Sequence, residues 1–255
     1  MVVLAFCVPA AGGCGALEEA ATPRPLPEYT RGLPPGTSRT PALESRLSFK
    51  VRESWKHLPM GEAKPRPLPE HTRKLDPGTY RTEEFEPAFS FGVGEGWRHL
   101  PMEESDDLAL AREQRLSLRF FEAREVYKPD ESYGVVGAPD DPVGWLRRHP
   151  FLRTSAPRTV TVGGIEGRRI DVTVVGDLPE GHRVGACGPD CVGLFGLGDG
   201  TALGVAKGDK VREIVLEDVE GETVIVGFGS PASMFEALAV PEAMEVIDTV
   251  EWRSS

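Results

Sequence analysis

Apolar and polar residues alternate in short runs from residue 85 onward, a pattern typical of β-strands that bury one face. The alternation predicts strands at residues 88–93, 107–112, 115–123, 158–163, 167–175, 201–206, 210–217, 222–228 and 248–252. Because most of these runs alternate, we expect a largely antiparallel sheet. Glu220 and Gly221 separate two of the runs and predict a tight hairpin turn.

Two segments carry helix start signals. The first, residues 140–148, opens with Asp140, Asp141 and Pro142 and ends before Pro150. The second, residues 231–247, opens at Pro231, and Pro241 is expected to interrupt it. The predicted class is α+β: a mostly antiparallel, twisted sheet with a short and a long helix packed on it, preceded by a Pro-rich extended arm.

An internal repeat is the strongest pattern in the chain. Residues 23–62 align without a gap to residues 65–104, with 25 of 40 positions identical. Two copies are too few for a solenoid, so this is a tandem duplication. Each copy has a Pro-rich opening, a Pro-Gly turn, and an alternating strand that ends at a tryptophan, Trp55 or Trp97.

The two copies differ on one face of that strand. Gly92, Gly94 and Gly96 of the second copy correspond to Lys50, Arg52 and Ser54 of the first. The glycine face suits a closely packed neighbour, and the charged face suits solvent. We therefore expect residues 65–255 to form the folded domain, with the second copy as its opening. Residues 21–64 are then an unpaired copy that acts as a linker or adds a strand to a sheet edge.

Composition and charge narrow the class of protein. Of 255 residues 40% are apolar, and no apolar run reaches the length of about 18 residues that a membrane span needs. Residues 21–82 carry 12 basic and 6 acidic residues, net +6, whereas residues 83–255 carry 17 and 32, net −15. A basic arm is thus joined to an acidic body, and the net charge of −11 disfavours nucleic acid as a partner.

The amino terminus resembles a bacterial lipoprotein signal. Residues 1–13 are apolar and end in the small residues Ala11, Gly12 and Gly13, directly before Cys14. Small residues before a cysteine are what lipoprotein signal peptidase requires, so we expect residues 1–20 to be a signal remnant with lipidation at Cys14. The usual leucine three positions before the cysteine is Ala11, and no basic residue precedes the apolar run. A plain secretory signal and an incidental apolar segment are the alternatives.

The remaining cysteines favour an oxidising compartment as the location of the protein. Once the signal is removed, the only pair is Cys187 and Cys191, separated by Gly188, Pro189 and Asp190. These turn-forming residues favour a local disulfide. A free thiol pair and a redox or metal site that uses His182 are the alternatives, although three intervening residues do not match the thioredoxin spacing.

We find no pattern for catalysis, a metal ion or a cofactor. The five histidines show no spacing, and Gly92–Gly96 lacks the Lys and the following helix of a phosphate-binding loop. We expect His99 to be a solvated histidine in a turn and residues 193–200 to be a loop that lines a pocket. Trp97, Trp145 and Trp252 are expected in the core or at its edge. As the alternative, Trp97, His99 and Trp145 form a candidate binding surface.

Three stretches between residues 85 and 252 show a recognisable order of strands, turns and helices. Residues 89–97 form an aromatic strand followed by Gly-Trp, residues 160–167 read as a strand, a glycine turn and a strand, and residues 235–252 read as a terminal helix and strand. This order resembles the PsbP-like α/β family, which includes photosystem II extrinsic proteins and many bacterial envelope lipoproteins. The segment Leu75 to Thr82 and the closing residues 248–252 look like exported proteins of high-GC bacteria. The resemblance implies a non-enzymatic envelope module and supplies no catalytic residue.

These patterns together predict an extracytoplasmic lipoprotein, held at a membrane by its lipid anchor, that binds an envelope protein or a small ligand. A secreted form is the alternative location. The alternative functions are an envelope enzyme with an unrecognised active site, a solute-binding sensor domain, and a cytosolic interaction domain. A cleft that holds a carboxyl group or histidine with a strongly shifted pKa would favour the enzyme.

Overall fold

The computed structural model describes residues 64–69, 71, 73–82, 85–100, 107–113, 115–129, 134–176, 178, 190–197 and 201–253. These residues belong to the structural unit Glu53–Ser255. The first repeat copy up to residue 63, Cys14 and Cys187 lie outside the described residues.

The described residues form strands of two to eleven residues and two helical segments. The strands of the first half are β1 (Arg66–Pro67), β2 (Arg73–Lys74), β3 (Gly78–Arg81), β4 (Phe89–Val93), β5 (Trp97–His99), β6 (Asp107–Arg112), β7 (Leu116–Glu122), β8 (Glu125–Tyr127) and β9 (Val135–Gly137). The remaining strands are β10 (Leu152–Thr154), β11 (Arg158–Val162), β12 (Ile165–Val174), β13 (Cys191–Gly196), β14 (Ala202–Ala206), β15 (Asp209–Val219), β16 (Glu222–Pro231) and β17 (Glu251–Trp252). The helices are α1 (Pro142–Arg148), α2 (Ala232–Met234), the π-helical turn Phe235–Ala239 and α3 (Val240–Ile247).

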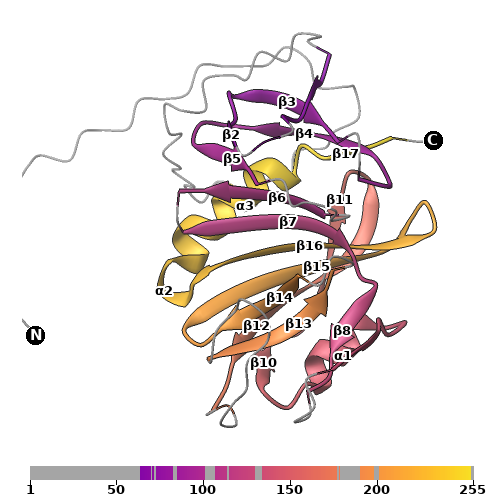
Figure 1. Ribbon diagram of the computed structural model, residues 1–255, viewed down its shortest axis with the longest axis vertical. Coiled ribbons are helices and arrows are strands. Elements are labelled where there is room, and N and C mark those ends of the chain that lie inside the picture. The colour runs from indigo at the N-terminus through magenta and orange to yellow at the C-terminus, as the bar shows by residue number, and fades with distance from the viewer. Residues whose placement is uncertain are drawn as a thin grey trace, which may run out of the picture. The chain divides into compact units, whose positions relative to one another are not determined.

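The strands of the described residues form three sheets (Figure 1). The central sheet has nine strands, in the order β10-β12-β15-β16-β7-β6-β5-β2, with β11 paired to β12. The first flanking sheet has the order β1-β3-β4-β17, and the second has the order β14-β13-β8-β9. Every described strand pair is antiparallel except β1 with β3, which confirms the predicted largely antiparallel α+β fold.

The strands of the central sheet send alternate side chains into two separate cores, as the pleat of a strand requires. In β16, Val224, Val226 and Phe228 enter the first core, whereas Ile225 enters the second. In β7, Phe120 enters the first core, and its neighbour Phe121 enters the second. Both faces of the sheet are therefore covered over its central strands.

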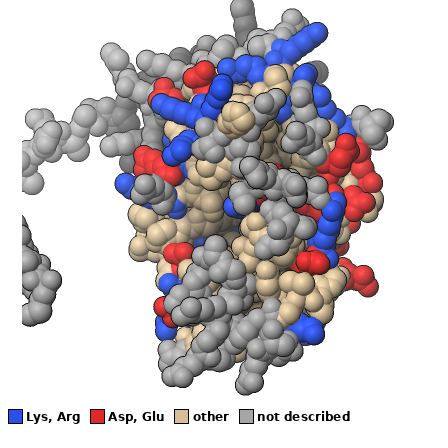
Figure 2. All heavy atoms as spheres, viewed as in Figure 1, with Lys and Arg blue, Asp and Glu red and all other residues tan. Residues whose placement is uncertain are grey.

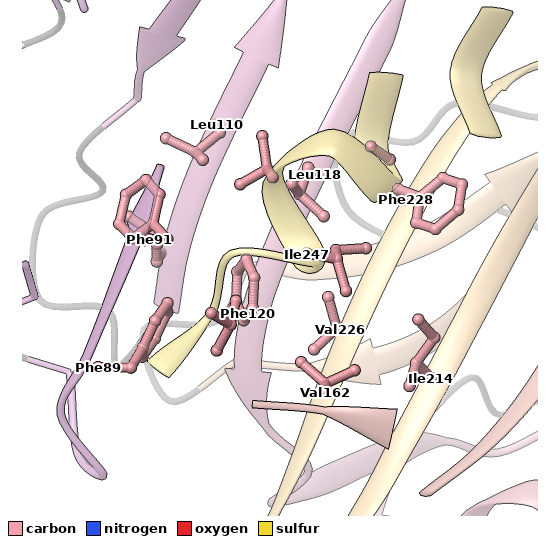
Figure 3. Close-up of a cluster of buried hydrophobic side chains, with 14 of the residues drawn as sticks. Phe89, Phe91, Leu110, Leu118, Phe120, Val162, Ile214, Val226, Phe228 and Ile247 are labelled. Atoms are coloured by element: carbon pink, nitrogen blue, oxygen red, sulfur yellow. The ribbon is translucent and has the colours of Figure 1, made fainter. Parts of the chain in front are cut away.

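The first core lies between the central sheet, the first flanking sheet and the segment Ala232–Ile247. Figure 3 shows Phe89 and Phe91 of β4 beside apolar side chains of β6, β7 and β16. The ring of Phe89 lies 4.7 Å from that of Phe120, and Phe228 stacks on Phe235 at 5.7 Å. The second core lies on the other face, where Phe121 packs 5.3 Å from Phe195 of β13 and α1 adds Val143 and Leu146.

The three stretches that resemble the PsbP-like family meet in the structure. The ring of Phe89 lies 4.9 Å from that of Trp252, and the indole N–H of Trp252 donates to the carbonyl oxygen of Val162 at 3.0 Å. A Cβ atom on Gly163 would lie 2.6 Å from the Trp252 ring, so the glycine turn makes room for the indole. The three stretches thus support one another at the end of the first core.

Most predicted elements are confirmed. The strand at 107–112 has the predicted bounds, and those at 88–93, 115–123, 158–163, 167–175, 201–206, 210–217 and 222–228 have ends that differ by up to three residues. Val219 pairs with Glu222 across the predicted hairpin turn, where Glu220 and Gly221 have φ of 55° and 94°. The last strand is shorter than predicted because Asp248 and Thr249 continue the hydrogen bonding of α3.

The helices also follow the prediction, with one difference. Asp141 caps α1, and its carboxylate accepts the N–H of Gly144 at 2.9 Å. The second helix runs without a break from Ala232 to Ile247, and Pro241 lies in the first turn of α3. The expected interruption takes the form of the π-helical turn before Pro241, because a wider turn tolerates the missing N–H of proline.

The prediction of a loop at residues 193–200 is wrong for its first half. Residues 193–196 belong to β13, whose residues are all buried. β13 pairs with β14 along one edge, with a shift of register between Gly193 and Phe195, and with β8 along the other. Glycine reduces strand propensity, but burial between two partner strands outweighs this preference.

Candidate ligand site

The three residues of the candidate binding surface do not form one surface. Trp97 is fully buried in the first core, with the Arg112 guanidinium 6.0 Å from its ring. His99 is also buried, in strand β5, and its Nδ1 lies 2.9 Å from the carbonyl oxygen of Pro69. The expectation of a solvated histidine in a turn is therefore wrong. Trp145 is half-buried on α1 and packs on the second core, 5.9 Å from Phe195.

Of the predicted lipidation and disulfide residues, the structure describes one. Cys191 is fully buried at the start of β13. Because Cys14 and Cys187 lie outside the described residues, lipidation and the disulfide remain predictions.

A pocket of about 280 Å³ lies on the face of the central sheet that carries the second core. We call it the trough. Its floor is the middle of β16, its flanks are β7 and β15, and β14 of the second flanking sheet lies along it. The lining residues are Ser117, Arg119, Phe121, Ala202, Leu203, Gly204, Val211, Glu213, Gly227, Phe228 and Gly229.

Two rows of paired residues run across the trough. In one row, Gly227 pairs with Arg119 on one side and with Glu213 on the other. In the next row, Gly229 pairs with Ser117 and with Val211. Because directly paired residues share a face of a sheet, both glycines point toward the trough. β16 itself therefore contributes no side chain to the floor of the trough at these two positions.

Neighbouring side chains occupy the space above these glycines. A Cβ atom on Gly227 would lie 2.5 Å from Glu213 Oε2, and one on Gly229 would lie 2.9 Å from Val211 Cγ2. Glu213 thus extends over Gly227, across the floor of the trough.

Glu213 is the unusual residue of this site. It is 4% exposed, and its Oε2 atom has no hydrogen-bond partner. Burial raises the pKa of its carboxyl group from 4.5 to about 8. An unpartnered buried carboxyl group costs stability, and such groups gather at functional sites.

On the opposite flank, Arg119 is already held by another carboxylate. Its Nη1 atom lies 2.5 Å from Oδ2 of Asp107, whose side chain is fully buried in β6. The guanidinium has five N–H groups, so further donors remain after this bond. Ser117 is exposed beside it and adds a hydroxyl group to the same flank.

The trough can therefore bind a small polar molecule between a carboxyl group and a guanidinium group. Its walls are mostly apolar, with polar groups at few positions, as is usual for sites that bind small molecules. Sequence reasoning missed this site. The available signal was Glu213, which has the same strand parity as Val211 and Val215 and so carries a carboxyl group on a face that is otherwise apolar.

A second pocket, of about 120 Å³, lies beside the helical segment and has Arg112, Met234, Leu238 and Glu242 among its lining residues. Its charged groups pair with each other, since Arg112 lies 3.7 Å from Glu242 and 3.5 Å from Glu245. Within the described part of the chain, no three His, Cys, Asp or Glu side chains gather as a metal site would require. No helix of that part is long and apolar enough to cross a membrane.

Comparison with known proteins gives matches only among solved structures. No family model matches the chain, and no curated protein does. The cyanobacterial PsbP (CyanoP) of Synechocystis sp. PCC 6803 matches with a TM-score of 0.37 and 9% identity, over 70% of this chain and 95% of that one. LpqN, involved in cell envelope biogenesis of Mycobacterium tuberculosis, matches with a TM-score of 0.34 and 10% identity, over 72% and 91%.

A protein of Bacteroides thetaiotaomicron also matches, with a TM-score of 0.35 and 12% identity, over 66% of this chain. The chain spans about half of that protein, 46% of its length. No functional residue is carried over from any of the three.

Proposed function

We propose that this chain is a non-catalytic, extracytoplasmic binding module that holds a small molecule in the trough. The observation that supports this function is the Glu213 carboxyl group, which is buried at the floor of the trough with an unpartnered oxygen. A ligand that hydrogen-bonds this group would offset the cost of burying it.

The size of the trough favours a small molecule over a protein segment. A volume of about 280 Å³ is in the range of a metabolite. The polar groups lie on the flanks of a glycine floor inside the trough, where a flat protein surface would not reach them. Binding a small molecule also needs no movement of the surrounding strands.

A membrane-anchored location is the second part of the proposal. It is supported by the small residues before Cys14 and by the closely spaced Cys187 and Cys191. Figure 2 shows Lys and Arg gathered at the end of the unit that carries β1, β2 and β3. Arg66, Arg73 and Lys74 are exposed there, and the basic residues 21–64 lead into this end. Basic side chains near an anionic membrane each contribute about 1 kcal/mol.

Acid–base catalysis by Glu213 is a second candidate function. A carboxyl group with a pKa of about 8 keeps its proton at neutral pH and can donate it to a substrate. Among the described residues that line the trough, however, there is no His, Cys or Lys to act as nucleophile or base. A binding role uses the groups present and needs no further one.

Filling the trough tests the proposed function. Ser117 is exposed at the trough, so Ser117→Trp should fold and should fill the trough. Thr159→Trp is the matched control, because it places the same side chain on an exposed position of β11. Each full-length protein is purified under native conditions and denatured, and the released small molecules are identified by mass spectrometry. We expect wild type and Thr159→Trp to release a molecule that Ser117→Trp lacks. Equal release from all three proteins, or release from none, would contradict the proposal.

Incubating the wild-type protein with the released molecule separates binding from catalysis. A binding module returns the molecule unchanged, whereas an enzyme that uses Glu213 converts it and loses this activity in Glu213→Gln.

The location is tested separately, by mass spectrometry of the membrane fraction. We expect an amino-terminal peptide that begins with diacylated Cys14, and an intact first methionine on protein from the cytosol would contradict the anchor.

A further inference from the structure

The trough places a carboxyl group and a guanidinium group on either side of one glycine. Glu213 and Arg119 are both cross-strand partners of Gly227, so their backbones are two strand spacings, about 10 Å, apart. Both side chains line the same pocket. Gly227 adds no side chain between them, and the Glu213 carboxyl group extends over it. One end of the trough thus carries an acidic group, and the other carries a basic group.

Glu213 has an unpartnered oxygen, and Arg119 has N–H groups beyond the one that Asp107 accepts. Among the described residues, none offers a hydrogen bond to Oε2 of Glu213, which is buried. An ionised carboxylate in such a place needs a cation beside it, and a cationic ligand would supply one. At the other end, Arg119 uses Nη1 for Asp107 and retains further N–H groups for a planar acceptor such as a carboxylate.

We propose that the ligand of the trough is a small zwitterion, with an amine bound at Glu213 and a carboxylate bound at Arg119. This inference rests on the proposed function, because it names the chemical class of the molecule that the trough holds. The gap between the Glu213 carboxyl group, which lies over Gly227, and the Arg119 guanidinium sets the length of the ligand. A molecule whose two charges are joined by a short chain fits this gap, whereas a molecule with one charge contacts only one of the two groups.

A series of ω-amino acids tests both the charges and the length. Glycine, β-alanine, 4-aminobutyrate, 5-aminopentanoate and 6-aminohexanoate are titrated into the full-length protein by calorimetry, together with the glycylglycine dipeptide. Each is compared with the amine and the carboxylic acid of equal chain length. We expect one length to bind best, and its single-charge analogues to bind about tenfold or more weakly.

Two variants assign the ends of the ligand. Glu213→Gln should remove the advantage of the zwitterion over the matched carboxylic acid, and Arg119→Gln should remove its advantage over the matched amine. Thr159→Trp should bind like wild type, and Ser117→Trp should not bind.

Several outcomes would overturn the inference. If the carboxylic acids bind as tightly as the zwitterions, Glu213 acts as a neutral donor and the ligand needs no amine. If none of these compounds binds while Ser117→Trp still loses a molecule released by wild type, the ligand belongs to another class and the proposed function stands. If none binds and wild type releases nothing, both proposals fail.

Discussion

The carboxyl group of Glu213 occupies the space that a side chain at Gly227 would need. The two residues are directly paired in β15 and β16, and a Cβ atom on Gly227 would lie 2.5 Å from Glu213 Oε2. Position 227 therefore has to be glycine for the carboxyl group to lie buried over the floor of the trough. The site depends on this pair and not on Glu213 alone.

Gly227→Ala should destabilise the protein. The added methyl group displaces the Glu213 carboxyl in a buried position, and such overpacking costs about 1–3 kcal/mol. Gly137→Ala is the matched control, because a Cβ atom there would meet nothing within 4 Å. Urea unfolding followed by circular dichroism measures both. Equal stability of the two variants would show that Glu213 moves aside without cost.

The stability of the protein should fall between pH 4.5 and about 8. In this range the buried Glu213 keeps its proton in the folded chain, whereas the unfolded chain releases it. The folded state binds more protons, so the free energy of unfolding decreases as the pH rises, by up to a few kcal/mol. Among the described neighbours of the Glu213 carboxyl group, Arg119 is the one charged side chain. The neighbours are Arg119 and Ser117 on β7, Ile170 on β12, and Ala202, Leu203 and Gly204 on β14.

Glu213→Gln is the variant that isolates this effect. Glutamine has nearly the same shape and does not titrate, so its unfolding free energy should lack the decrease and exceed that of wild type above pH 8. Unfolding in urea at several pH values gives both curves. Parallel curves for wild type and variant would mean that Glu213 is not responsible.

The closely packed glycines of the second repeat copy should not accept the residues of the first. The N–H of Gly92 donates to Oγ1 of Thr249 at 2.7 Å, and a Cβ atom there would lie 3.3 Å from the same oxygen. Gly92→Lys, which introduces the residue at position 50, should therefore cost about 2 kcal/mol by pushing Thr249 at the end of α3 away. Thermal and urea unfolding measure this cost.

Gly94→Arg provides the comparison, since it introduces the residue at position 52. A Cβ atom at Gly94 would lie 3.0 Å from Oε1 of Glu245, which is the end of a flexible side chain and can pair with the new arginine. We expect a smaller loss than for Gly92→Lys. If Gly92→Lys is as stable as wild type, the first copy is able to replace β4, and the two copies are interchangeable.

The sequence predicted both helices and the long strands except β13, because these elements carry a local signal. Alternation over six or more residues identified β6, β7 and β15, and the Asp141 cap marked the start of α1. The strands β1, β2, β5, β8, β9 and β10 have two or three residues each, too few to alternate visibly, and pairing with a neighbour is what makes them strands.

The trough was not predictable in the same way, because it depends on pairing between distant strands. Glu213, Gly227 and Arg119 become one row only through the registers of β15, β16 and β7. Tryptophan and histidine, the residue types at positions 97 and 99, suit both a surface and a core. Both side chains are buried because β5 packs against the first core.

Removing Asp171 should destabilise the protein strongly, because the buried Arg212 would keep only the exposed Glu236 carboxylate, 3.7 Å away. Arg212 is 6% exposed and makes two bonds to Asp171, at 2.6 and 3.1 Å. Lys210 also lies 2.9 Å from Asp171. Breaking a buried pair of this kind costs about 3 kcal/mol, so we expect a loss of this size for Asp171→Ala.

The same pair also gives a pH dependence of the opposite sign to that of Glu213. Burial alone raises the pKa of Asp171, but the hydrogen bonds and charges of Arg212 and Lys210 outweigh it and leave the pKa below its ordinary value of 3.8. Its contribution to stability is therefore present above pH 3.8 and is lost as the pH falls through the lowered pKa.

Arg115→Ala, which breaks an exposed pair with Glu113, is the control and should change the unfolding free energy by less than about 1 kcal/mol. Equal losses for Asp171→Ala and Arg115→Ala at neutral pH would show that Arg212 finds another partner, and the acid limb should then be the same in the Asp171 variant as in wild type.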